Sequence, residues 1–532
     1  MTTTIIIGGV AGGMSTATRL RRNDEDMEII VLEASGNVSF ANCGLPYYVG
    51  NVITDRDALL LQTPEALKDR FNLDVRVNTR AVSIDRDNQT ITTEQGETLK
   101  YDTLVLSPGA NPIQLPIDGI EHALTLRNVE DVDRIVAATE GAKSAAVIGG
   151  GFIGLELAEN FTHRGIKTTV IERGPEIMAP LDSEMSAIVR KHLEANGVTV
   201  LLNADTTRID TNSITLSDGR TIDSDITIAA VGVAPANELA VMAGLEVGER
   251  GGIVVDDEQR TSDPKIFALG DAAEKRDGID GTDTLVPLAQ TANRHGRMVA
   301  DIIAGRDTKR TGTLGTSIVG LFGLSAASVG WNERRARQKG HNLRLIHLHP
   351  ADHAGYYPGA STVHLKLVVN ADTDEILGAQ GVGQAGVDKR IDVIATAMRA
   401  GLKATDLADL ELSYAPQFSS AKDPVNMAGF INDNMIRGEK TVQYYEIEEK
   451  LAQGFELIDV RETSEYAAGA IPGSRNIPLN TLRDHIDELR GKKIIVHCQT
   501  GVRSHTATSL LRNNEIDVSN LDGGYVTWAA VQ

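Results

Sequence analysis

The sequence predicts an α/β protein with four parts: two strand–helix–strand units that form parallel sheets, a mixed α+β segment and a further α/β domain at the C-terminus. Two buried strands that each lead into a glycine-rich turn predict the first two parts. A cysteine placed between a late strand and a helix predicts the last one. Because glycine turns of this kind join strand to helix in nucleotide-binding folds, we expect both units to be Rossmann-like.

The first glycine turn lies near the N-terminus. A strand over residues 3–7 leads into Gly8-Gly9-Val10-Ala11-Gly12-Gly13 and a helical pattern to about residue 23, and a strand over residues 28–32 ends at Glu33. Such glycines let a pyrophosphate approach the helix N-terminus, and the acid binds a ribose hydroxyl. Val10 departs from the G-x-G-x-x-G pattern, whereas Gly8, Gly13 and Glu33 fit it.

The second glycine turn fits the pattern fully. A strand over residues 145–148 leads into Gly149-Gly150-Gly151-Phe152-Ile153-Gly154 and a helix, and a strand over residues 167–171 ends at Glu172. Two glycine turns without any ligand are the alternative. Since both turns lie between strand and helix, we predict two bound dinucleotides, the second held by Gly149, Gly151, Gly154 and Glu172.

Charge and composition limit the partners. The chain has 532 residues, and 52 lysines and arginines against 73 acidic residues give a net charge of −21, which argues against nucleic-acid binding. No apolar run approaches the roughly 18 residues of a membrane span, and the N-terminus lacks a basic leader. We therefore expect a cytoplasmic protein without membrane contact, and we predict no metal site.

Three short motifs resemble those of the two-dinucleotide flavoprotein reductases. Thr261–Asp271 resembles their flavin motif, and Ser107-Pro108-Gly109-Ala110 and Val231–Pro235 resemble their linking motifs. The resemblance implies FAD at the first glycine turn, with Gly109 and Asp271, and NADH or NADPH at the second. Glu172 favours NADH because a carboxylate repels a 2′-phosphate, although the adjacent Arg173 weakens that argument.

The same resemblance implies five segments and a homodimer. The FAD-binding domain is divided by the NAD(P)-binding domain, and an α+β dimerisation domain and the C-terminal domain follow. The expected boundaries are 1–115 and 245–325 for FAD binding, 116–244 for NAD(P) binding, 326–435 for dimerisation and 436–532 for the tail.

A single cysteine, Cys43, lies where related reductases carry a pair. A lone thiol cannot form an internal disulfide, so it must cycle through a sulfenic acid or a mixed disulfide with an external thiol. The surrounding segment Ser39–Gly50, together with Tyr356–Gly359 and Ala421–Asn426, resembles the CoA-disulfide reductases. The resemblance implies NAD(P)H-dependent reduction of CoA disulfide, CoA persulfide or polysulfide through FAD and Cys43.

NADH oxidases and peroxidases, which also use a lone cysteine, are the alternative. They carry a histidine at the start of the first helix, where this chain has Val10. Without that proton donor, peroxide chemistry through a Cys43 sulfenic acid is disfavoured. A sulfane-sulfur carrier with a vestigial flavin half is a third hypothesis.

The resemblance also assigns substrate-binding and catalytic side chains. Tyr356 and Tyr414 of the partner subunit would face Cys43 across the dimer interface. Ser15, Arg19 and Arg22 share one helix face by their spacing, and two guanidiniums there suit the phosphates of CoA, although a solvated face is the simpler interpretation. The resemblance adds four more CoA contacts: Ser39, Asn42, Asn293 and Lys422.

The tail is similar to rhodanese domains. Cys498 opens a loop that runs into a helix, whose amides and dipole would stabilise a thiolate or persulfide. Arg503 offers an anion-binding fork. Four residues separate Cys498 from Arg503, one fewer than a phosphatase loop needs, so we expect a rhodanese domain that handles sulfane sulfur. An inactive, structural rhodanese domain remains the alternative.

Overall fold

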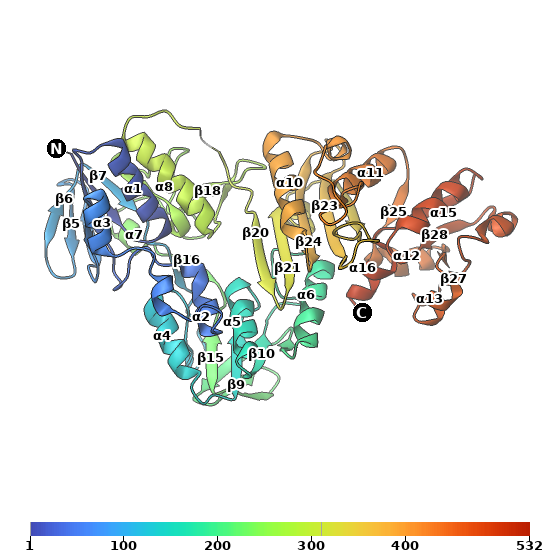
Figure 1. Cartoon of the computed structure of the whole chain (residues 1–532), viewed down its shortest axis with the longest axis horizontal. Helices are drawn as coiled ribbons and strands as arrows, with labels where there is room; N and C mark the ends of the chain where they lie inside the picture. The colour runs from blue at the N-terminus through green and yellow to red at the C-terminus, as the bar shows by residue number, and fades with distance from the viewer. Residues whose placement is uncertain (1, 310) are drawn as a thin grey trace. The chain divides into compact units, whose positions relative to one another are not determined.

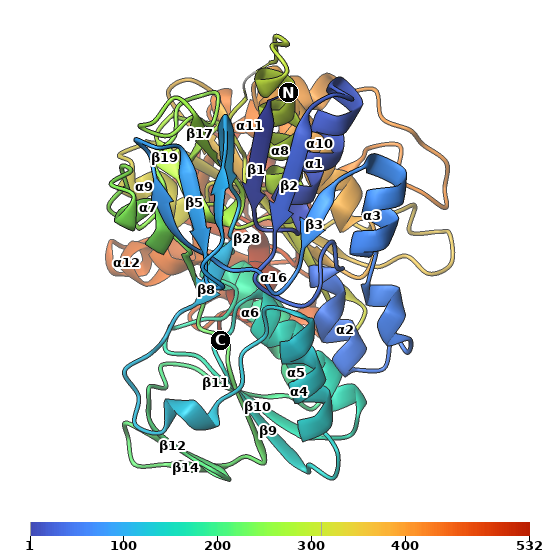
Figure 2. The same cartoon turned by 90° about the vertical axis from the view of Figure 1, so that its left-hand side faces the viewer.

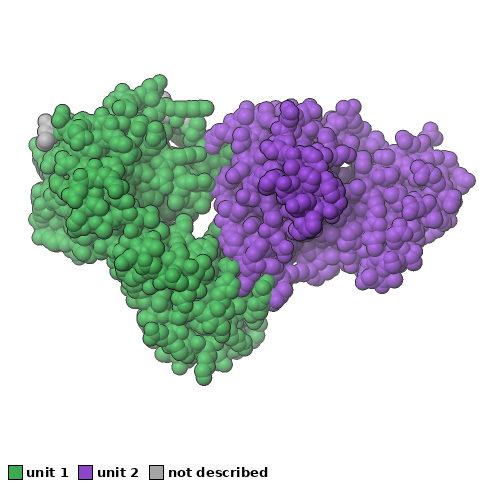
Figure 3. Space-filling view, viewed as in Figure 1, with its two compact units in different colours: residues 1–175, 196–315 green, residues 176–195, 316–532 purple. Residues whose placement is uncertain are grey.

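The computed structural model describes residues 2–309 and 311–532 and divides into two compact units. The first unit comprises residues 1–175 and 196–315, and the second comprises residues 176–195 and 316–532 (Figure 3). Within the described residues, no helix combines the length and apolar character that crossing a bilayer requires.

A five-stranded parallel sheet forms the centre of the first unit. Its strand order is β17 (Ile266–Ala268), β7 (Thr103–Leu106), β1 (Thr3–Ile7), β2 (Glu28–Leu32) and β3 (Asp74–Arg76). Helices α1 (Ala11–Asn23) and α8 (Ala289–Ile303) pack against each other beside this sheet, as Figures 1 and 2 show. Because both faces of the sheet are covered, its strands are apolar throughout rather than alternating.

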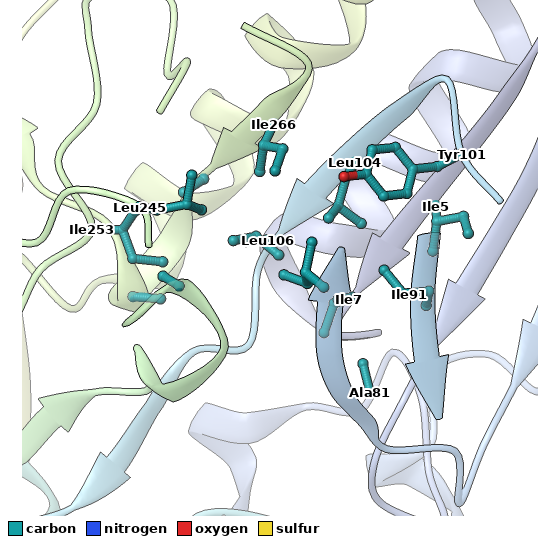
Figure 4. Close-up of a cluster of buried hydrophobic side chains, with 14 of the residues drawn as sticks. Ile5, Ile7, Ala81, Ile91, Tyr101, Leu104, Leu106, Leu245, Ile253 and Ile266 are labelled. Carbon is teal, nitrogen blue, oxygen red and sulfur yellow. The ribbon is translucent and has the colours of Figure 1, made fainter. Parts of the chain in front are cut away.

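The two faces of the sheet form separate hydrophobic cores. Ile5 and Ile7 point into one core with Leu104, Leu106 and Ile266 (Figure 4). The intervening Ile6 points to the opposite face, where it packs with residues of α1. The two-residue period of a strand therefore explains why every position of the run Ile5–Ile7 is apolar.

A four-stranded parallel sheet carries the second glycine turn. Its order is β11 (Thr199–Leu201), β10 (Lys167–Ile171), β9 (Ser144–Ile148) and β15 (Ile226–Ala229). Its helices are α5 (Phe152–His163) and α4 (Val129–Ala138), and a capping box between Asn128 and Asp131 starts α4. The strand–turn–helix order predicted for both nucleotide units is therefore present.

Smaller elements complete the first unit. Two three-stranded antiparallel sheets consist of β4 (Ala81–Asp85), β5 (Thr90–Thr93) and β6 (Thr98–Lys100), and of β12 (Thr206–Asp210), β13 (Ser213–Leu216) and β14 (Thr221–Asp223). Two strand pairs are β8 (Ala110–Pro112) with β16 (Val233–Pro235), and β18 (Lys275–Arg276) with β19 (Asp283–Thr284). The remaining helices are α2 (Leu45–Val49), α3 (Pro64–Phe71) and α7 (Glu238–Met242).

The second unit begins with an antiparallel sheet. Its order is β20 (Ser317–Leu321), β21 (Leu324–Gly330), β24 (Ile376–Gly383), β23 (Val363–Asn370) and β22 (Leu343–Leu348). Helices α9 (Glu333–Gln338), α10 (Val387–Ala400) and α11 (Pro424–Ile436) accompany it. Helix α6 (Ser183–Ala195) also packs here, because Asp182 and Gln380 exchange two hydrogen bonds, at 2.8 and 2.6 Å. The sequence offered no sign that this helix leaves the second nucleotide unit.

The tail forms the other sheet of the second unit, and this sheet is parallel. Its order is β25 (Lys440–Val442), β29 (Asp517–Leu521), β28 (Lys493–His497), β26 (Glu456–Asp459) and β27 (Arg475–Asn476). Its helices are α12 (Ile447–Ala452), α13 (Thr463–Ala467), α14 (Ile486–Leu489), α15 (Val502–Arg512) and α16 (Gly524–Ala530).

Candidate active site

The two glycine turns have the same backbone geometry. Gly8 has a φ of +101° and Gly149 a φ of +106°, and a Cβ at these positions would lie 2.0 Å from the Ser107 carbonyl oxygen and 2.4 Å from that of Ala230, respectively. Inside the helices, a Cβ at Gly13 or Gly154 would come within 1.8 or 2.1 Å of the carbonyl oxygen of Gly8 or Gly149. Only glycine therefore permits these strand-to-helix turns.

Both strand-terminal glutamates face the glycine turns. Glu33 accepts a hydrogen bond from the Gly9 amide, and Glu172 accepts one from the Gly150 amide, each at 2.8 Å. A carboxylate in this place can hold a ribose hydroxyl beside the phosphate-binding turn. The predicted residues of each nucleotide site thus come together, at the carboxyl end of its own sheet.

The first turn and Asp271 fit the phosphates and polyol chain of FAD. Within the described residues no side chain caps α1 or α5, so their first amides are available to a pyrophosphate. A Cβ at Gly109 or Gly151 would meet open space. Burial raises the pKa of Asp271, and Lys275 and Arg127 offset this only in part, so hydroxyl donors from a ligand would stabilise its carboxylate.

Cys43 lies in a short 3₁₀ turn, Asn42–Gly44, directly before α2. The residue is exposed at this turn, yet loss of water on its protein side raises the pKa of the thiol, and the negative charges of Glu156 and Asp271 raise it further. The fold therefore brings the lone thiol near the acid of the flavin motif, although 228 residues separate Cys43 and Asp271 (271 − 43).

A tyrosine and a glutamate next to Cys43 were missed by sequence reasoning. The Tyr47 hydroxyl, one turn after Cys43, donates to Glu156 of α5 at 3.3 Å. Burial raises the pKa of Glu156 to about 7, despite the hydrogen bond from Tyr47, and Glu159 adds to the rise. The signal was an acid that directly follows the apolar residues Phe152–Leu155 at the start of the helix.

Helices α2 and α5 hold these groups together. The Arg164 guanidinium donates to the Val49 carbonyl oxygen at 2.9 Å, and a Cβ at Gly50 would lie 1.8 Å from the Asn160 side-chain oxygen. Gly50 therefore permits the close approach of α2 to α5 that sets Tyr47 beside Glu156.

The two predicted interface tyrosines meet in the second unit. The hydroxyls of Tyr356 and Tyr414 lie 3.2 Å apart, and the two residues are 77% and 50% exposed. The hydrogen bond with Tyr414 raises the pKa of Tyr356. An exposed pair of phenols next to the exposed Tyr357 and Phe418 is suited to a protein interface.

The predicted CoA residues differ in whether other side chains already bind them. Ser15 hydrogen-bonds Asn293, as expected for residues that share a site. Arg19 forms a bidentate ion pair with Asp301, at 2.7 and 3.1 Å, so its charge is already neutralised. Arg22 is exposed, with its guanidinium 5.9 Å from the centre of the Phe71 ring. Ser39 has a φ of +48°, and Asn42 and Lys422 are exposed.

Cys498 is buried at the start of its loop, with 1% of its surface exposed. The Gly501 amide donates to its sulfur at 3.2 Å, and the Ser504 hydroxyl lies 3.5 Å from it. Gly501 has a φ of +96° and precedes α15, and the loop turns the Gly501 amide toward the sulfur.

The two arginines at this loop are held by carboxylates. Arg503 donates to both carboxylate oxygens of Glu465, at 2.6 and 2.7 Å, and its hydrogen bonds lower the pKa of Glu465 to about 2. Arg461 binds Asp459 at 2.7 Å and reaches the side chain of Gln499 at 3.1 Å. The predicted anion fork of Arg503 is thus already occupied by Glu465.

Comparisons with known proteins identify the families that the parts of this chain match. Residues 2–296 match the family described as pyridine nucleotide-disulphide oxidoreductase, residues 316–424 match its dimerisation domain, and residues 443–531 match the rhodanese-like domain. The coenzyme A disulfide reductase of Staphylococcus haemolyticus is 35% identical over 434 residues, which cover 80% of this chain and 98% of that protein.

Two solved structures match along nearly the whole chain. The reduced CoADR-RHD of Bacillus anthracis is 46% identical with a TM-score of 0.98, covering 99% of this chain and 98% of that one. A NAD-dependent persulfide reductase from A. fulgidus is 36% identical with a TM-score of 0.93, covering 99% and 100%.

Proposed function

The chain belongs to the pyridine nucleotide-disulphide oxidoreductase family, and we propose that it uses NADH and FAD to reduce the sulfur–sulfur bonds of CoA disulfide and CoA persulfide through Cys43. The observation that carries the proposal is the environment of Cys43, a lone thiol near the flavin-motif acid Asp271 and the half-buried pair Tyr47–Glu156. Its alternative, an oxidase or peroxidase, becomes an outcome of the test below.

The proposed cofactor sites follow the two glycine turns. Gly8, Gly13, Glu33, Gly109 and Asp271 would hold FAD, and Gly149, Gly151, Gly154 and Glu172 would hold NADH. Bound FAD would supply the transfer of two electrons from NADH to sulfur. The carboxylate of Glu172, which accepts a hydrogen bond from the Gly150 amide, would repel the 2′-phosphate of NADPH.

Cys43 would perform the exchange step. Its sulfur attacks the disulfide of the substrate and forms a mixed disulfide with one half, while the other half leaves as a thiolate and takes up a proton. Two electrons from NADH then cleave the mixed disulfide and restore the Cys43 thiol. In sum, NADH, a proton and one disulfide give NAD⁺ and two thiols, and a persulfide gives one thiol and hydrogen sulfide.

Substrate binding is proposed to involve both subunits of a homodimer. Tyr356 and Tyr414 of the partner subunit would donate a proton to the leaving sulfur. Of the two arginines on this helix face, Arg22 is the one available to a CoA phosphate, since Arg19 would first have to release Asp301. Ser15, Ser39, Asn42, Asn293 and Lys422 would complete the CoA site.

The rhodanese domain is proposed to accept and donate sulfane sulfur at Cys498. The Gly501 amide, 3.2 Å from the sulfur, supports this proposal, because it would stabilise a persulfide on this cysteine. The tail would thereby extend the substrates to polysulfide, and sulfurtransferase activity would reside there.

Steady-state NADH oxidation tests the proposal. The FAD-loaded protein is assayed with CoA disulfide, CoA persulfide, inorganic polysulfide and hydrogen peroxide. We expect turnover with the CoA substrates and little with peroxide. Turnover with peroxide alone would assign the protein to the oxidase and peroxidase class, and a protein that NADH fails to bleach would be a sulfur carrier instead.

A further inference from the structure

We infer that His347 is a positioning residue, which holds the Cys498 loop against the antiparallel sheet of the dimerisation domain and thereby sets the delivery of sulfane sulfur from the tail. The inference rests on the proposed function of Cys498. All the residues that carry it lie in the second compact unit.

His347 joins two carboxylates from distant segments. Its Nδ1 lies 2.6 Å from Asp522 in the tail, and its Nε2 lies 2.9 Å from Glu184 in α6. The Asp522 carboxylate also accepts the His347 backbone amide at 3.0 Å. A ring with a carboxylate at each nitrogen donates from both, which only the imidazolium can do.

The charge of this imidazolium is strongly favoured. Burial by itself would lower the pKa of His347, but Asp522 and Glu184 outweigh that effect and raise it to about 9, against opposition from Lys366. The imidazolium therefore carries its charge at neutral pH, although His347 is only 3% exposed. We call the contact of His347 with Asp522 and Glu184 the junction.

Asp522 connects His347 to the reactive loop. It is followed by Gly523 and Gly524, after which the Tyr525 amide donates to the Cys498 carbonyl oxygen at 2.8 Å. The packing is close, because a Cβ at Gly523 would lie 2.8 Å from the Cβ of His347. A shift of Asp522 would therefore be passed to the backbone of Cys498 within three residues.

The surrounding charges make the junction a closed network. The Lys366 ammonium lies 2.9 Å from Asp182, 2.5 Å from Glu184 and 2.8 Å from Glu333. These three carboxylates have the spacing of a cation site, and the ammonium already serves as their cation. Tyr444 and Tyr445, from the start of the tail, donate to Glu184 at 3.2 Å and to Glu333 at 2.8 Å.

The segment that follows the strand of His347 leads along the chain to the interface tyrosine Tyr356. Two residues on, His349 Nε2 lies 2.8 Å from the Thr527 hydroxyl of the tail, and its Nδ1 lies 2.9 Å from His364. The chain then reaches Tyr356, seven residues after His349. One short segment therefore contacts the Cys498 domain at one end and bears a proposed reductase residue at the other.

This arrangement predicts a specific pH dependence. The groups that face the imidazolium are Asp522, Glu184, Lys366 and His349. Because the docked pKa is raised, the contribution of His347 to docking is complete below its ordinary pKa of 6.5 and is lost as the pH rises through about 9. Alkaline conditions should therefore loosen the Cys498 loop.

Two His347 variants and one control test the inference. In His347→Gln a neutral amide replaces the imidazolium, and in His347→Leu the polar contacts of the side chain are lost while the backbone amide still reaches Asp522. His485→Gln is the control, because His485 pairs with Glu488 on the exposed surface of the tail that carries Cys498. Hydrogen exchange of the peptide around residues 497–504 is measured on the FAD-loaded protein between pH 6.5 and 9.5, beside NADH oxidation with inorganic polysulfide and with CoA disulfide.

We expect the loop amides to exchange at least several-fold faster in both His347 variants, with polysulfide turnover reduced relative to CoA-disulfide turnover. After correction for intrinsic exchange, protection should fall with rising pH in the parent protein and should be lower and flat in His347→Gln. Parental loop protection in both variants would overturn the inference. If Cys498 proves dispensable for polysulfide turnover in the parent protein, the proposed role of the tail fails, while the exchange data still decide whether His347 positions the loop.

Discussion

The hydroxyls of Tyr356 and Tyr414 lie 3.2 Å apart, although 58 residues separate them in the chain. Their hydrogen bond raises the pKa of Tyr356, so at neutral pH this phenol keeps its proton and remains a donor. Both residues are at least half exposed, so the pair is accessible to a ligand or a second subunit. We propose that it acts on the leaving sulfur at Cys43 of the other subunit.

Removing either phenol tests that connection. We expect Tyr356→Phe and Tyr414→Phe to lower kcat for CoA disulfide by roughly 10²-fold, which is the low end for a lost general acid. Tyr466→Phe is the matched control, since the Tyr466 hydroxyl donates a hydrogen bond to the Ser474 carbonyl oxygen within the tail. Stopped-flow reduction of the flavin by NADH should be unchanged in all three variants, and unchanged turnover in both interface variants would remove these phenols from the mechanism.

Replacing the lone thiol should separate the two half-reactions. We expect Cys43→Ser to abolish reduction of CoA disulfide and CoA persulfide, because serine cannot form the mixed disulfide. NADH should still bleach the flavin absorbance, which is followed under anaerobic conditions. Substantial CoA-persulfide turnover in this variant would contradict the proposed mechanism.

Glu156 should control the ionisation of Cys43. Burial raises the pKa of this thiol most, and the negative charge of Glu156 raises it further. Glu156→Gln should therefore lower the pKa of Cys43. Alkylation of Cys43 by iodoacetamide, followed by mass spectrometry against pH, should then reach its half-maximal rate at a lower pH. Glu65→Gln, in the exposed first turn of α3, is the control. An unshifted alkylation profile in Glu156→Gln would show that this charge is screened from the thiol.

The sequence sufficed to predict those features that short spacings encode. The glycine turns at Gly8 and Gly149, the acids Glu33 and Glu172, and the loop of Cys498 each lie within one strand–turn–helix unit. The junction could not be predicted in this way, because His347 is 163 residues from Glu184 and 175 from Asp522. In the sequence His347 is an unremarkable polar residue in a strand, and its two partners become visible only in the fold.

Helical spacing likewise explains only part of the proposed CoA site. It placed Ser15, Arg19 and Arg22 on one face of α1, and α8 packs against that helix. The partner of Arg19 lies on α8, however, and Asp301 neutralises the guanidinium that the spacing marked as a phosphate ligand. The side chains of a neighbouring helix decide which of two equivalent arginines is free.

The two arginines should therefore behave differently on substitution. Arg22→Ala should raise KM for CoA disulfide about tenfold or more, since a charge-assisted contact contributes roughly 1.5–3 kcal/mol, and should leave KM for inorganic polysulfide unchanged. Arg19→Ala removes an ion pair whose side chains are only 18% and 12% exposed, so it should also lower the melting temperature. Equal effects of Arg22→Ala on both substrates would identify its helix face as merely solvated.

The last prediction concerns how the two cysteines share the reaction. Cys498 is not expected to replace Cys43, because its buried sulfur belongs to the rhodanese loop, whereas Cys43 belongs to the segment that resembles the CoA-disulfide reductases. Covalent attachment nevertheless raises the effective concentration of a Cys498 persulfide for the flavin site, provided that the geometry allows contact.

Cys498→Ser should therefore leave the reduction of CoA disulfide nearly intact, since that substrate needs no carrier. The substitution should abolish sulfur transfer by the tail and slow NADH oxidation with polysulfide and with poorly soluble sulfur donors. NADH turnover of both proteins is compared across the soluble and insoluble donors. If the variant matches the parent protein with every sulfur donor, the tail takes no part in this reaction, and the coupled mechanism is wrong.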